Sequence, residues 1–161
     1  MFDEYVGLYG ARLFGLCLKL CAHRQDAEDL YQETWYKAYK NFDKCDPERG
    51  VEGWLTTICV NTYRDMLRRQ KWRGLLVRFG TNEQQDLALA NIPEPVPPDY
   101  TDVHEAVQAL PGKYRIVVVL YYFNGLDVAQ TARALGLPVG TVKYQLHRAR
   151  ELLKRRLEED G

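Results

Sequence analysis

Apolar residues lie three and four positions apart along most of the chain, which is the spacing of amphipathic helices. Three such stripes predict helices in the first part of the sequence, over residues 2 to about 21, 26 to about 42, and 51 to about 72–74. Asp26 is a candidate N-cap of the second helix. Pro47 and Gly50 break the pattern before the third helix, so we expect a loop over residues 43–50.

The helical pattern is lost from Thr81 to Thr101. This stretch is acidic and carries Pro93, Pro95, Pro97 and Pro98, none of which can continue a helix. We therefore predict an interdomain linker over residues 75–101. It would join a first domain, residues 1–74, to a second domain, residues 102–161.

The second domain contains one segment with conflicting signals. Residues 116–123 are apolar and partly β-branched, and Asn124-Gly125 follows, so local propensity favours a β-hairpin. No alternating second arm follows, and Asp127 can cap a helix instead, so we interpret Asn124-Gly125 as a helix C-cap. After the turn Gly136-Leu137-Pro138, another long apolar stripe begins. The predicted fold is all-α: two small helical domains joined by a flexible linker, the second a helix-turn-helix domain.

Composition excludes several classes of protein. No run of apolar residues in the 161-residue chain is long enough to span a membrane, and Asp3 and Glu4 stand where a secretory signal would be basic. We expect a cytoplasmic protein with no membrane contact of its own. Cys17, Cys21 and nearby His23 could hold a metal, but no paired ligand spacing accompanies them. Packing is the favoured role of the cysteines, and we predict neither a cofactor nor a metal.

Charge is segregated along the chain, although the formal net charge is zero. Residues 61–80 hold six basic side chains against one acidic, and residues 111–157 hold nine against two. Residues 81–110 between these blocks hold six acidic side chains and none that is basic. Basic blocks on helices are typical of modules that bind phosphates, so nucleic acid is the expected ligand.

The last helix supplies a candidate face for reading DNA. Its apolar residues Val142, Leu146 and Ala149 are committed to the core, which leaves polar side chains outward near its N-terminal end. A basic face that is merely solvated is the alternative. The candidate DNA-reading residues on this helix are Thr141, Lys143, Tyr144, Gln145, His147 and Arg148.

Several motifs together resemble one family over nearly the whole chain. They are Asp26-Ala-Glu-Asp-Leu-Tyr-Gln-Glu-Thr34, Asp46-Pro-Glu-Arg-Gly50, Trp54-Leu-Thr-Thr-Ile58, Gly136-Leu-Pro-Val-Gly-Thr-Val-Lys143 and His147-Arg-Ala-Arg-Glu151. In this order they resemble the extracytoplasmic function (ECF) group of bacterial sigma factors. The resemblance implies a region 2 domain, which binds the polymerase clamp and the minus-ten element, and a region 4 domain, which binds the minus-thirty-five element and the flap. It also implies an anti-sigma partner.

Carried over by position, the resemblance assigns Asp29, Gln32 and Glu33 to the beta-prime clamp of core RNA polymerase. Asp26 and Glu28 beside them could equally serve the helix N-terminus alone. The minus-ten element would be opened and read by the loop at 43–50 and by one face of the third helix. The residues concerned are Lys44, Asp46, Arg49, Thr57, Asn61, Arg64 and Arg68.

The sequence departs from the usual pattern of the family near the loop at 43–50. Cys45 stands where an aromatic residue is frequent, and the interval from Gly50 to Trp54 is one residue short, so the base pocket can differ. Trp54 itself lies in an apolar stripe and is expected in the core rather than as a stacking platform.

A stand-alone helix-turn-helix regulator would explain only the second domain. An enzyme is not predicted, because carboxylates do not cluster near the basic helices.

Overall fold

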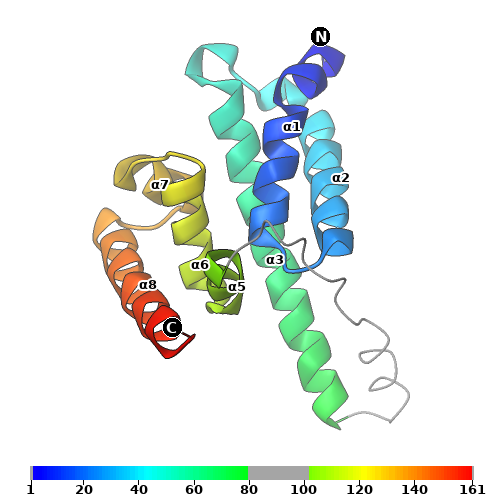
Figure 1. The fold of residues 1–161 in the computed structure, drawn as a ribbon. Coiled ribbons are helices and arrows are strands. Elements are labelled where there is room, and N and C mark those ends of the chain that lie inside the picture. The colour runs from blue at the N-terminus through cyan, green and yellow to red at the C-terminus, as the bar shows by residue number, and fades with distance from the viewer. Residues whose placement is uncertain (1, 80–101, 161) are drawn as a thin grey trace.

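The computed structural model describes residues 2–79 and 102–160, except for the side chains of residues 49, 71–79, 102, 159 and 160. Every regular element in these ranges is helical, and the helices form two groups that lie side by side (Figure 1). Residues 2–79 are called the first half below, and residues 102–160 the second half. The predicted all-α class is confirmed.

The first half is built from three long helices and two short 3₁₀ turns. These are α1 (Phe2–Leu20), α2 (Arg24–Lys40), η1 (Phe42–Lys44), η2 (Pro47–Arg49) and α3 (Val51–Phe79). Leu20, Leu30 and Val60, one from each long helix, are completely buried where the three helices meet. A second apolar cluster lies at the other end, where the Phe2 ring meets the Trp35 ring edge-on at 5.6 Å between centroids. The three apolar stripes thus form the core that their spacing predicts.

Two predicted boundaries in the first half are wrong. Helix α2 begins at Arg24 with His23 as N-cap, not with Asp26, which lies in the first turn instead. The pair from Arg24 to Glu28, at 3.2 Å, supports that earlier first turn. Helix α3 continues to Phe79, past the predicted end. A single glycine such as Gly74 destabilises a helix by only about 1 kcal/mol, which is too little to end a long one. The predicted linker therefore starts inside α3, and its residues 80–101 lie outside the described chain.

The second half consists of α5 (Asp102–Ala109), α6 (Gly112–Val118), the π-helical turn η3 (Val119–Phe123), α7 (Val128–Leu135) and α8 (Val139–Asp160). The ambiguous segment is helical, and Gly125 leaves it with a φ of 71° as a helix C-terminus requires. Asp127 caps α7 in a reciprocal capping box with Gln130, as predicted. Gly136 then ends α7 in the left-handed conformation at φ 66°.

The two halves share one apolar core. Leu16 and Leu20 of the first half belong to the same buried cluster as Val117, Leu120 and other residues of the second half. Helices α5, α6 and α7 face α1 and α3, whereas α8 packs on the second half and lies on its far side in Figure 1. The reading helix of the helix-turn-helix is therefore directed away from the first half.

The capping box generates a stability prediction. The Asp127 carboxylate accepts a bond of 2.7 Å from the Gln130 backbone N–H, so Asp127→Ala leaves that N–H without its partner. We expect a loss of about 1 kcal/mol in the free energy of unfolding, measured by urea denaturation. Asp43→Ala, at an exposed position of the other half, is the matched control and should change it by less than about 0.5 kcal/mol. Equal losses in both variants would contradict a specific role for the cap.

Candidate functional site

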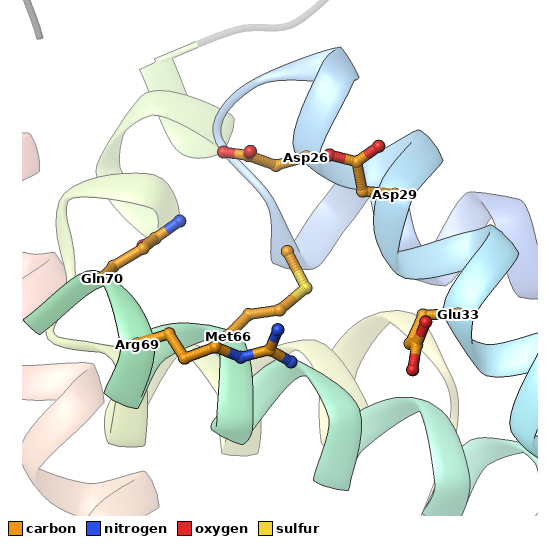
Figure 2. Close-up of a pocket in the computed structure, with 6 residues that line it drawn as sticks. All are labelled: Asp26, Asp29, Glu33, Met66, Arg69 and Gln70. Carbon is orange, nitrogen blue, oxygen red and sulfur yellow. The ribbon is translucent and has the colours of Figure 1, made fainter. Parts of the chain in front are cut away.

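An acidic cleft of about 200 Å³ lies between α2 and α3 (Figure 2). Asp26, Asp29 and Glu33 line it from α2, while Met66 and Arg69 reach into it from α3. Gln70 completes the lining. The cleft thus offers carboxylates on one wall and an apolar methionine on the other, which suits the stem and charged head of a basic side chain.

The predicted clamp residues fall on or beside this acidic cleft. Asp29 and Gln32 are exposed, and Glu33 is half-buried at its edge. Asp29 accepts a hydrogen bond of 3.2 Å from Gln25, and Leu30 and Thr34 of the same helix are fully buried. The second wall was missed from the sequence, since only the packing of α3 against α2 brings Arg69 opposite Glu33.

The predicted minus-ten residues are divided between the loop and one face of α3. Lys44 and Asp46 are exposed in the loop, where Asp46 accepts the backbone N–H of Glu48 at 3.1 Å. The side chain of Arg49 lies outside the described residues. The spacing of the helix residues places them along one side of α3; they are Thr57, Asn61, Arg64 and Arg68.

Arg64 differs from its prediction as an exposed DNA contact. Its Nη1 donates a hydrogen bond of 2.8 Å to the carbonyl oxygen of Leu135, the last residue of α7, and the side chain is only half exposed. Arg68, exposed one turn further on, donates to the Asp65 carboxylate. Trp54 packs partly against the second apolar cluster, as expected for a core residue. Asn61 and Arg68 are therefore exposed, whereas Arg64 is half-buried and bound to the second half.

The reading face of α8 is largely exposed and internally paired. Lys143 and Tyr144 project freely, with Tyr144 62% exposed. His147 and Arg148 both contact Glu151, at 3.0 and 2.9 Å. The hydrogen bond from Arg148 holds the pKa of the Glu151 carboxyl below its usual value, so the acid stays ionised beside these two donors.

Two further predicted residues of α8 are less accessible. Thr141 is half-buried in the first turn. Gln145 is also half-buried, and its Oε1 is buried with no hydrogen-bond partner among the described residues. The prediction of an outward Gln145 is wrong for that oxygen, because position 145 lies beside the buried stripe through Val142 and Leu146.

An apolar groove of about 620 Å³ crosses the second half between α5, η3 and α8. Tyr122 and Phe123 stand exposed at its side, and Leu157 is 38% exposed at its end. Arg150 and Lys154 line the same groove. A contiguous apolar surface of this kind marks an interaction site more often than a packing fault.

The cysteines are packed in the core rather than gathered around a ligand. Cys17 and Cys59 are fully buried, with their Sγ atoms 3.8 Å apart, and burial raises the pKa of Cys21 to about 12. Among the described residues no group of His, Cys, Asp and Glu side chains could hold a metal ion. Nor do those residues include a helix with the length and apolarity needed to cross a bilayer.

Two family models match the chain: Sigma-70 region 2 over residues 5–73, and Sigma-70, region 4, over residues 100–153. The ECF RNA polymerase sigma factor SigW of Bacillus subtilis is 31% identical, covering 98% of this chain and 89% of that protein. The RNA polymerase sigma-H factor of Pseudomonas aeruginosa is 30% identical, covering 98% and 86%. Among solved structures, the sigma factor RpoE of Bartonella quintana, crystallised with the anti-sigma factor NepR, matches 99% of this chain and 98% of its own at TM-score 0.75 and 25% identity.

A helix-turn-helix with an exposed basic reading helix, joined to a three-helix unit with an acidic cleft, defines a transcription factor with two working surfaces. The matches to both regions, in their order along the chain, place it in a family. The chain belongs to the sigma-70 family, in its ECF group, and functions as an alternative sigma factor. The members of this family are not enzymes.

The contacts of Glu151 with His147 and Arg148 predict what removal of the Glu151 carboxylate does. Glu151 occupies His147 and Arg148 and also repels phosphates, so Glu151→Gln should raise affinity for DNA of any sequence, by up to about tenfold at low salt. Fluorescence anisotropy with two unrelated duplexes measures this. Glu158→Gln, which removes the same charge from the far end of α8, is the control and should have a smaller effect. Equal effects would mean that only net charge matters.

Proposed function

We propose that this sigma factor docks on the clamp of core RNA polymerase through the acidic cleft and reads promoter DNA with α3 and α8. The single observation that carries the proposal is the acidic cleft, because it gathers two of the three predicted clamp residues, Asp29 and Glu33, at one place on the surface. Carboxylates there complement a basic helix or coiled coil of a partner. Transcription with purified core polymerase, followed by mapping of the transcript starts, tests the whole proposal.

Promoter reading would be shared between the two halves. In the second half, Lys143 and Tyr144 lie exposed in the first turns of α8, where a recognition helix meets base edges in the major groove. Arg155 lies three turns further along and suits a phosphate. In the first half, the loop at 43–50 and the exposed side chains of Asn61 and Arg68 would hold the opened minus-ten strand.

The apolar groove would take the polymerase flap. Its apolar floor and the rim cations Arg150 and Lys154 fit an amphipathic segment with acidic flanks. The sigma factor RpoE of Bartonella quintana is bound to the anti-sigma factor NepR in its solved structure, so an anti-sigma partner for this chain belongs to the proposal. The chain would act in the cytoplasm, where the polymerase is, and would contribute binding without covalent chemistry of its own.

The acidic cleft makes a prediction about polymerase binding. Gln32→Ala combined with Glu33→Lys should weaken binding to core polymerase at least tenfold, because an amide is lost and a carboxylate becomes a like charge for a basic partner. Thermal melting should change little, since Gln32 is exposed and Glu33 lies half-buried at the edge of the cleft, outside the apolar core. Glu105→Lys, an exposed charge reversal on α5, is the matched control and should bind as the unchanged protein does. Retained affinity in the double variant would remove the acidic cleft as the docking site.

The reading helix makes a second prediction. Lys143→Ala should cost about 1 to 3 kcal/mol at the preferred promoter and relax base preference at one or two upstream positions, because a base-edge donor is removed. Arg155→Ala should weaken all sequences alike and reduce the slope of log affinity against log salt by about one. Selection from a promoter library at two salt concentrations measures both effects. A changed consensus with Arg155→Ala and an unchanged one with Lys143→Ala would reverse the assigned register of α8.

A further inference from the structure

A chain of polar contacts runs from α2 to the exposed side of α3, and it begins at Lys37. The Lys37 ammonium donates a hydrogen bond of 3.2 Å to the hydroxyl oxygen of Thr62 on α3. Its Nζ also lies 3.9 Å from Oδ2 of Asp65, one turn further along α3. The other carboxylate oxygen, Oδ1, accepts a hydrogen bond from Nη2 of Arg68. One carboxylate is thus placed between two cations, each of which faces its own oxygen.

Lys37 is held in place through both its main chain and its side chain. Its carbonyl oxygen accepts the backbone N–H of Asn41 at 3.0 Å and the side-chain Nδ2 of the same residue at 2.9 Å. The hydroxyl of Thr62, a fully buried residue, donates to the carbonyl of Ile58 at 2.7 Å, so its oxygen is left to accept from the ammonium. The cation therefore has a fixed position beside Asp65.

The opposite end of the chain of contacts is open to solvent. The Arg68 side chain is 73% exposed, and Asp65 is half-buried. Arg68 follows Asn61 by two turns, on the side of α3 to which the proposed function gives the opened minus-ten strand. An exposed arginine gains little from a surface carboxylate, so it can leave that partner for a phosphate. The carboxylate then remains on the same helix, close to the strand.

We propose that Lys37 is a positioning residue of promoter recognition, which neutralises the Asp65 carboxylate when Arg68 exchanges that carboxylate for a phosphate of the opened strand. The inference rests on the proposed function, since it takes the minus-ten strand as the ligand of Arg68. Lys37 itself does not touch the DNA. Its charge keeps Asp65 from recapturing Arg68 and from repelling the phosphate.

The geometry fits this exchange. Because the two cations face different oxygens of Asp65, Arg68 can depart while the ammonium stays where it is. At 3.9 Å the ammonium is beyond the length of a direct hydrogen bond, but its attraction for the carboxylate is still strong near a protein surface. The next lysine of α2 cannot take its place, since Lys40 lies over the ring of Tyr36, 5.0 Å from the centroid.

A double-mutant cycle tests whether Lys37 acts through Asp65. The assay is binding of the holoenzyme to its mapped promoter, with a noncomplementary template strand keeping the minus-ten element open. Lys37→Met should lower the affinity about three- to tenfold. It should also reduce the slope of log affinity against log salt by about 0.7, because Arg68 stays with Asp65 and one single-strand phosphate contact is lost. In the Asp65→Asn background, Lys37→Met should change the affinity by less than about twofold.

Two controls accompany the cycle. Lys40→Met removes the same charge from an exposed position of the same helix and should change promoter affinity by less than about twofold. The affinity of Lys37→Met for core polymerase alone should equal that of the unchanged protein, although Glu33 of the acidic cleft lies one turn before it.

The outcomes separate the possible failures. Equal losses from Lys37→Met in both backgrounds would show that the lysine contacts DNA itself or supports the fold, and would overturn the proposal. A parallel loss of polymerase affinity would also overturn it, because Lys37 would then act through the acidic cleft. Absence of transcripts from the unchanged protein with core polymerase would instead contradict the proposed function.

Asp65→Asn alone covers the case in which Lys37→Met does not fold. The substitution keeps the shape of a half-buried side chain, removes the charge that repels the strand and frees Arg68. Affinity for the opened promoter should therefore rise about two- to fivefold. An unchanged or lower affinity would show that the carboxylate does not oppose binding, and would overturn the proposal.

Discussion

Each half of this molecule donates hydrogen bonds to a helix C-terminus of the other half, around one shared apolar core. No glycine or asparagine follows Leu20, so the last carbonyls of α1 have no Schellman-type turn to satisfy them. Gln108 and Arg115 of the second half supply the missing donors. Helix α7 does end at a left-handed glycine, Gly136, yet the Leu135 carbonyl still accepts a further bond from Arg64. The position of one half on the other thus follows from where these carbonyls point, and the shared apolar core fills the space around them.

Three of the cations predicted to contact DNA are bound to other groups of the chain. Arg64 is bound to a carbonyl, Arg68 to Asp65, and Arg148 to Glu151. Each is therefore satisfied within the chain and would exchange its partner for phosphate or base on the promoter. Exposed ion pairs such as these contribute little to the free energy of folding, so Arg68 and Arg148 would lose little stability in the exchange.

The features predicted correctly from the sequence are those that depend on short-range chemistry. The three apolar stripes predict α1, α2 and the start of α3, and Asp127 predicts the cap of α7, because each signal lies within a few residues of the element it forms. The predicted end of α3 and the predicted N-cap of α2 are wrong. Gly74 alone does not end α3, and the pair of Arg24 and Glu28 supports a first turn of α2 that begins before Asp26. The bond from Arg64 to Leu135 joins residues 71 apart in sequence, and no periodicity reports such a contact. The second wall of the acidic cleft escaped prediction for the same reason.

The packing of the two halves determines which surfaces are accessible. Helix α8 packs on α5, α6 and α7 and lies on the far side from the first half (Figure 1), so its reading face stays open. The acidic cleft lies between α2 and α3, and its Arg69 wall is exposed (Figure 2). The two surfaces of the proposed function, the acidic cleft and the exposed face of α8, are thus both accessible in this arrangement of the halves.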